Sequence, residues 1–181
     1  TNILNLSVKV KGGIKQNEVR PLVESSDKLR FSDRDIYYNK YAIIKNSPLK
    51  PFIASRGCPF SCAFCFNEKL RMIYSTKGEY IRFYSPKRLI DEIKYVQDKY
   101  GLKAIYFTDD LFVFNQKWLE EFTHLYKKEV KKPFVCSAHV NTLNEEVIKL
   151  LKDAGCHAVS FGIETGNEKM RNELLNKYIS N

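Results

Sequence analysis

The sequence has 181 residues, of which 44% are hydrophobic and 28% charged, and these proportions exclude a disordered chain. The 30 Lys and Arg outnumber the 21 Asp and Glu and give a formal net charge of +9, but no block of five like charges occurs, so no nucleic-acid partner is expected. No apolar run of 18 residues and no signal peptide is present, so we expect no membrane span. The first residue is Thr1 and not Met, and we therefore expect a fragment of a longer protein.

Residues 1–49 have only weak periodicity, with short apolar patches at 3–10 and 37–44. We expect a linker or packing arm there. Residues 50–181 alternate between strand-like and helix-like segments, which is typical of α/β proteins. The apolar patterns predict strands at 51–54, 103–108, 134–138 and 158–163, and helices at 85–100, 115–129, 142–154 and 166–178.

Local signals mark the ends of two of these helices. Ser85 is a good N-cap for helix 85–100, Pro86 suits its first turn, and Gly101 suits its end. Thr142 and Glu145 have the spacing of a capping box, which predicts that the third helix begins there. Four strands alternating with helices predict an α/β fold with a parallel sheet. We expect a partial (β/α) TIM-like barrel of about four βα units, with its last strands missing and one edge exposed.

Three of the five cysteines, Cys58, Cys62 and Cys65, lie within eight residues in a CxxxCxxC pattern. Closely spaced thiolates from one loop hold iron–sulfur clusters, and three ligands for four irons leave one iron open. Such thiolates persist in a reducing compartment, so we expect a cytoplasmic protein. Two alternatives remain: three inert buried thiols, or a zinc site whose fourth ligand would come from His124, His139, His157, Cys136 or Cys156.

The segment RGCPFSCAFCFN at 56–67, directly after the first predicted strand, and the αβ repeats that follow resemble the radical S-adenosylmethionine (radical SAM) superfamily over about residues 50–178. The resemblance implies a 4Fe-4S cluster on the three cysteines, with S-adenosylmethionine chelating the open iron through its amino and carboxylate groups. It implies reductive cleavage to a 5′-deoxyadenosyl radical that abstracts hydrogen from a substrate. It also implies that Phe64 lies against the adenine, and that flavodoxin or ferredoxin donates the electron.

Polar residues follow each later strand, at the carboxyl ends where parallel α/β folds bind ligands. Asp109 and Asp110 follow the second strand, where the family often has Gly-Gly-Glu; either could accept hydrogen bonds from the cofactor's ammonium group, or the two could complement a helix dipole. Glu164 resembles the family's ribose-contacting position, although it could cap a helix. Ser137 and His139 are weaker cofactor or substrate contacts, and His139 could equally be structural.

The segments 33–41, 56–67, 109–112 and 162–166 are most similar to the cobalamin-dependent branch of this family. In that branch cobalamin usually delivers a methyl group to an unactivated carbon of a small-molecule substrate. The resemblance implies that cobalamin would bind through a domain preceding Thr1, and that residues 1–49 form the linker after it. An RNA methylthiotransferase-like enzyme and a non-enzymatic iron–sulfur carrier are the alternatives. Because an unfinished barrel exposes its cofactor pocket to water, we expect this chain alone to turn over slowly or not at all.

Overall fold

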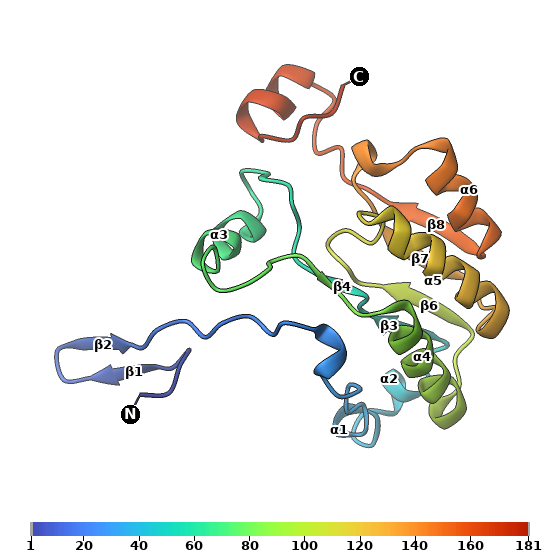
Figure 1. Ribbon diagram of the computed structural model, residues 1–181, viewed down its shortest axis with the longest axis horizontal. Helices are drawn as coiled ribbons and strands as arrows, with labels where there is room; N and C mark the ends of the chain where they lie inside the picture. The colour runs from blue at the N-terminus through green and yellow to red at the C-terminus, as the bar shows by residue number, and fades with distance from the viewer. Residues whose placement is uncertain (1, 181) are drawn as a thin grey trace.

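The computed structural model describes residues 2–180; Thr1 and Asn181, the outermost residues of the two expected domains, lie outside the described residues. Strands β3 (Leu49–Phe52), β6 (Ala104–Phe107), β7 (Phe134–Ser137) and β8 (Cys156–Ser160) form a parallel sheet in the order β3-β6-β7-β8. Helices α4 (Pro86–Tyr100), α5 (Gln116–Glu129) and α6 (Glu145–Asp153) pack on one face of this sheet (Figure 1). The predicted α/β class with a parallel sheet is confirmed, and β8 is an edge strand within the described residues.

Helices α4 and α5 begin where their capping residues indicate. The Ser85 hydroxyl accepts a hydrogen bond from the amide of Arg88 (3.3 Å), and α4 ends at Gly101, whose φ of 69° favours glycine. The Asn115 side chain accepts from the amide of Trp118 (3.0 Å) at the start of α5. Both caps satisfy amides that the first turn of a helix leaves unpaired.

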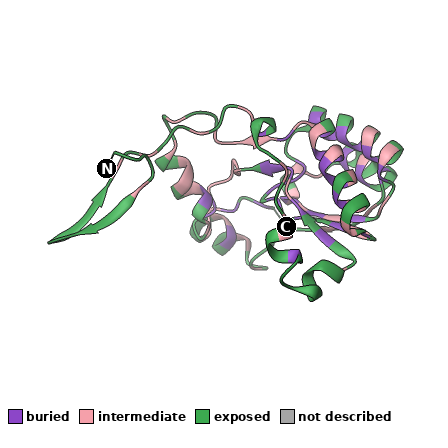
Figure 2. Cartoon of the chain, turned by 90° about the horizontal axis from the view of Figure 1, so that it is seen from below, coloured by how far each residue is buried: buried purple, intermediate pink, exposed green. Residues whose placement is uncertain are grey.

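The hydrophobic core lies between the sheet and the three helices, where Figure 2 shows the buried residues concentrated. Its centre is an aromatic cluster made of Phe107, Phe112, Trp118, Phe122 and Phe134, with ring centroids 4.5–6.3 Å apart. Complete burial of one such side chain stabilises the fold by roughly 1.5–3 kcal/mol. This core makes the sheet a rigid support for the loops at its carboxyl end.

Two of the expected helices differ in the structure. The capping-box prediction is wrong: the Asn144 side chain caps α6, whereas the Thr142 hydroxyl donates to the carbonyl of His139 (2.7 Å) in the short helix η2 (Val140–Thr142). The predicted helix 166–178 is reduced to a single π-helical turn, η3 (Met170–Leu174). Asn176 takes a left-handed φ of 50°, so the chain turns back and cannot continue the helix.

The ends of two strands are also shifted. The first parallel strand, β3, covers 49–52 rather than 51–54, and the last, β8, covers 156–160 rather than 158–163. Residues 55–56 instead form the short strand β4 (Ser55–Arg56), which pairs antiparallel with β5 (Arg82–Phe83). Helix α3 (Phe66–Ile73) lies between β4 and β5 in the chain. None of the helices within residues 2–180 is long and apolar enough to cross a membrane.

The first 48 residues contain more structure than their weak periodicity suggests. Strands β1 (Ser7–Val10) and β2 (Gly13–Gln16) form an exposed hairpin that projects from the body (Figures 1 and 2). The short helices η1 (Ser26–Lys28), α1 (Asp35–Tyr38) and α2 (Ala42–Asn46) follow.

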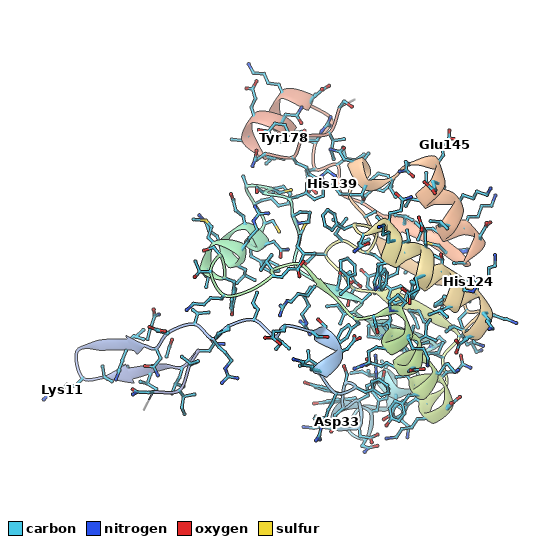
Figure 3. The ribbon with its side chains drawn as sticks, viewed as in Figure 1. Lys11, Asp33, His124, His139, Glu145 and Tyr178 are labelled. Atoms are coloured by element: carbon cyan, nitrogen blue, oxygen red, sulfur yellow. The ribbon has the colours of Figure 1, made fainter. Side chains whose placement is uncertain are left out.

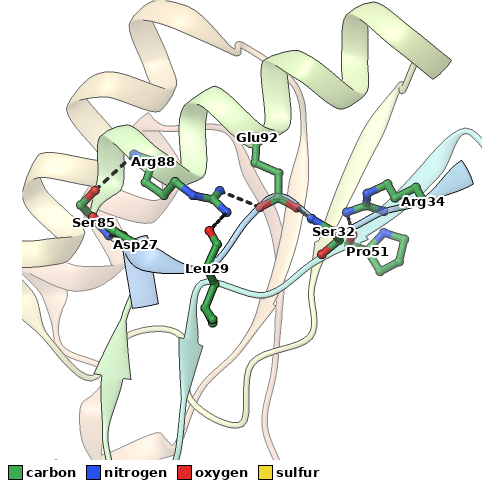
Figure 4. Close-up of polar contacts among 8 residues, drawn as sticks. All are labelled: Asp27, Leu29, Ser32, Arg34, Pro51, Ser85, Arg88 and Glu92. Carbon is green, nitrogen blue, oxygen red and sulfur yellow. Dashed lines mark hydrogen bonds and ion pairs between the residues drawn. The ribbon is translucent and has the colours of Figure 1, made fainter. Parts of the chain in front are cut away.

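Polar contacts attach this arm to α4 and β3 (Figure 4). The ion pair between Arg88 and Glu92 (2.8 Å) on α4 is largely buried, and both side chains also bond to the backbone of the arm. The Arg34 guanidinium donates to the carbonyl of Pro51 (2.7 Å) and stacks on Phe52. Residues 29–34 of the arm are therefore held against α4 and β3, whereas the hairpin projects from them.

Candidate functional site

The three clustered cysteines lie on the loop between β4 and α3, at the carboxyl end of the sheet. Cys58, Cys62 and Cys65 all line one cavity of about 230 Å³. Phe60 and Phe64 line it as well, and Phe64 is 56% exposed. One loop thus surrounds a single small space with three thiols and two aromatic rings.

A chain of contacts from α3 and the following loop positions this segment. Gly57 has a φ of 89°, and a Cβ there would lie 2.6 Å from the carbonyl oxygen of Tyr80, so only glycine fits. The Tyr80 hydroxyl donates to the side-chain oxygen of Asn67 (2.8 Å). The buried Asn67 amide in turn donates to the Cys65 sulfur (3.6 Å). These contacts hold both ends of the cysteine loop.

The C-terminal segment packs against the same loop from the other side. The amide of Ala63 donates to the carbonyl of Leu175 (2.9 Å), and the Asn176 side chain donates to the carbonyl of Ser61 (2.7 Å). The buried Arg171 guanidinium bonds the carbonyls of Thr165 and Ile179 and so closes the segment on itself. The missing helix 166–178 is therefore replaced by a cap on the cysteine loop.

The carboxyl ends of β6, β7 and β8 complete the cavity with Asp110, Ser137, His139 and Ser160. His139 is buried against Phe60, with ring centroids 3.8 Å apart, and its Nδ1 accepts from the amide of Asn141 (3.3 Å). Burial, together with the nearby charge of Lys177, lowers the pKa of His139. Figure 3 shows His139 next to the segment that carries Tyr178, whereas His124 lies on α5.

Asp109 and Asp110, which the sequence could not distinguish, point to different places. Asp109 is 3% exposed and accepts hydrogen bonds from the amides of Ala54 and Ser55 and from the Ser55 hydroxyl. It does not line the cavity; it joins the end of β6 to the connection between β3 and β4. Asp110 is exposed and lines the cavity; burial raises the pKa of Cys58, and the charge of Asp110 adds to this rise.

Glu164 reaches the cavity through a partner that sequence reasoning missed. Its carboxylate pairs with the Lys177 ammonium (2.8 Å), which is 8% exposed, lines the cavity and lies 5.8 Å from the centroid of Phe64. Glu164 itself takes a left-handed φ of 67°. No local sequence signal marks Lys177, because its position depends on the turn at Asn176.

The model for the radical SAM superfamily matches residues 52–180, which include the whole cavity. The chain belongs to the radical SAM superfamily. It is 35% identical over 180 residues to an uncharacterized methyltransferase of Pyrococcus horikoshii, covering 98% of this chain and 38% of that protein. It is 26% identical to the cytidylyl-2-hydroxyethylphosphonate methyltransferase of Streptomyces wedmorensis, covering 78% of this chain and 25% of that protein.

A solved radical SAM structure shares the fold. TsrM, a radical S-adenosylmethionine methyltransferase of Kitasatospora setae solved with cobalamin and a [4Fe-4S] cluster, superimposes with a TM-score of 0.61 at 16% identity. The match covers 77% of this chain and 28% of that chain. The chain therefore spans only about a quarter to two fifths of the length of these relatives.

The donor set around the cavity fits the radical SAM cluster. A four-iron cluster binds its cysteines at separate corners, so its ligands surround a space and do not converge on one point. Cys58, Cys62 and Cys65 line one space from a single loop, which is the donor chemistry that such a cluster needs. Burial raises the pKa of Cys58 and of Cys62, while the charge of Lys177 opposes this at Cys62. Cluster binding must therefore displace protons from both thiols.

A matched pair of glycine substitutions tests the contact between Glu164 and Lys177. A Cβ on Gly162 would collide with the Glu164 carboxylate and approach the Lys177 ammonium, whereas a Cβ on Gly166 would meet open space. We expect Gly162→Ala to lower the free energy of unfolding by at most about 1 kcal/mol, because the flexible ends of the Glu164 and Lys177 side chains must move apart. Gly166→Ala is expected to change it by less than about 0.5 kcal/mol. Urea denaturation measures both, and equal values for the two variants would contradict the packing described here.

Proposed function

We propose that this chain is the cluster- and cofactor-binding part of a radical SAM methyltransferase that uses cobalamin and acts on a small molecule. The observation that carries the proposal is the cavity itself, because three thiols of a CxxxCxxC loop and the ends of three parallel strands surround one space. When bound there, the cluster supplies the electron that cleaves S-adenosylmethionine reductively.

In this proposal the cysteines and several polar and aromatic side chains hold the cofactors. Cys58, Cys62 and Cys65 hold three irons and leave the fourth open. The exposed ring of Phe64 lies against the adenine. Asp110 accepts hydrogen bonds from the ammonium group, since the carboxylate of Asp109 is already occupied by Ala54 and Ser55.

The remaining side chains orient the cofactor and limit the access of water. Glu164 accepts the ribose hydroxyls, in the way that a carboxylate holds a ribose in dinucleotide sites. Lys177, as its partner, sets the position of that carboxylate. Ser137 and His139 line the same wall, and the stacking of His139 on Phe60 closes one side of the cavity.

The names of the relatives support methyl transfer, because the Pyrococcus and Streptomyces proteins are both described as methyltransferases. Cobalamin use is supported by the sequence resemblance to the cobalamin-dependent branch. In this proposal residues 1–49 join a cobalamin-binding domain to the core formed by residues 50–181. Flavodoxin or ferredoxin would donate the electron, and the cytoplasm would keep the thiols reduced.

Anaerobic reconstitution with iron and sulfide tests the proposal on the 181-residue chain. We expect about four irons per chain and, after reduction, an electron paramagnetic resonance signal that changes when S-adenosylmethionine is added. The change is expected because the cofactor ligates the open iron. Bound zinc in place of iron, or a cluster signal that ignores the cofactor, would contradict the proposal.

A further inference from the structure

Two arginines lie opposite each other in the strand pair beside the cysteine loop. Arg56 of β4 and Arg82 of β5 are direct cross-strand partners in an antiparallel ladder. Side chains at such positions lie on the same face of the pair, and like charges there destabilise it. The hydrophobic core does not require this arrangement, because Arg56 is exposed and Arg82 is half-buried.

Neither guanidinium forms an ion pair with a carboxylate in the described chain, although the charge of Glu79 acts on Arg82 and Asp110 lines the same cavity. Among the ion pairs of residues 2–180, none involves Arg56 or Arg82. One amino group of Arg82 donates to the carbonyl of Val23 (3.3 Å), but its Nε is buried and has no hydrogen-bond partner in the described chain. Apart from the bond to Val23, neither guanidinium donates a hydrogen bond to a described residue, so the two arginines keep amino donors for a bound anion.

Both arginines line a cavity of about 440 Å³ that adjoins the cysteine cavity. Asn67 and Asp110 border both cavities. Leu70, Tyr74 and Tyr80 add apolar and aromatic surface to the arginine cavity. A molecule held by the two guanidinium groups would therefore extend toward the three thiols.

We propose that Arg56 and Arg82 bind an anionic oxygen-bearing group of the substrate, such as a phosphate, phosphonate or carboxylate. Guanidinium groups match these oxyanions with paired hydrogen bonds, and an anion between them converts their repulsion into attraction. The identity of the ligand as the substrate rests on the proposed function. The anion site itself does not require the cluster.

Calorimetric titration of the metal-free 181-residue chain with inorganic phosphate and with acetate, at constant ionic strength, tests this site. We expect saturable binding of at least one anion, weakened about tenfold in Arg56→Gln and in Arg82→Gln. Tighter phosphate binding would indicate a phosphoryl or phosphonyl group, and tighter acetate binding a carboxylate. Arg20→Gln removes the same charge from the exposed arm and is expected to leave the affinity unchanged.

Absence of saturable binding, equal affinities in wild type and Arg56→Gln, or an equal loss in Arg20→Gln would overturn the proposal. Circular dichroism establishes that each variant is folded. If Arg82→Gln does not fold, Arg56→Gln decides, because the Arg56 side chain is exposed. Anion binding in a chain that takes up no cluster would contradict the proposed function alone, and a normal cluster without anion binding would contradict this inference alone.

Discussion

Replacement of Asp109 by alanine is expected to lower the free energy of unfolding by about 3 kcal/mol at pH 7. The carboxylate accepts hydrogen bonds from two amides and one hydroxyl at residues 54 and 55, all of them buried. Its removal leaves these donors unpaired where water cannot replace the acceptor. Urea denaturation of the metal-free chain measures the change.

The neighbouring residue provides the control. Asp110 is exposed and accepts no hydrogen bond from another described residue, so Asp110→Ala is expected to cost less than about 0.5 kcal/mol. Equal destabilisation by the two substitutions would show that Asp109 does not hold the strand connection.

Asp109 also makes stability depend on pH. Burial raises the pKa of this carboxyl from its ordinary value of 3.8 to about 6. The folded state then binds the proton more tightly than the unfolded state, so this contribution to stability is complete below about pH 4 and is lost as the pH rises through about 6. Between about pH 4 and pH 7, we expect the free energy of unfolding of the wild type to fall by roughly 3 kcal/mol relative to that of Asp109→Asn. Stability profiles that run parallel over this range would show that Asp109 is not the group that titrates.

Replacement of Cys62 by serine is expected to reduce the iron content after reconstitution from about four atoms per chain to less than about one. Thiolates are the ligands that hold such a cluster, and two remaining cysteines leave two irons without a protein bond. Cys58→Ser and Cys65→Ser are expected to behave alike, because all three thiols line the same cavity. Iron and sulfide analysis together with the visible absorption spectrum measure the loss.

Cys156→Ser is the matched control for this experiment. Cys156 is half-buried on β8 and does not line the cavity, and its thiol bonds the carbonyl of Ala158 (3.4 Å). We expect this variant to keep about four irons per chain. Loss of iron in Cys156→Ser to the same extent as in Cys62→Ser would show that the cysteines of the CxxxCxxC motif are not the specific ligands of the cluster.

Several features could be predicted from the sequence because they depend on residues close together in the chain. The four parallel strands and helices α4, α5 and α6 follow from their periodicity, apart from shifted ends, and the caps of α4 follow from Ser85 and Gly101. The cysteine motif required no structure at all, since three thiols within eight residues already indicate one site. The capping box at Thr142 was wrong because Thr142 and Asn144, two positions apart, both suit an N-cap; Thr142 belongs to the short helix η2, and Asn144 caps α6.

Other features were decided only by the tertiary structure, because they join residues that are distant in the sequence. Asp110 rather than Asp109 faces the cysteines, because Asp109 accepts hydrogen bonds from residues 54 and 55, which precede it by more than 50 positions. Lys177 reaches the cavity only because the segment after η3 folds back onto the cysteine loop. The Arg56–Arg82 pair likewise depends on strand pairing. The sequence by itself determined the motif and the family it resembles, whereas long-range packing determined which charges surround the site.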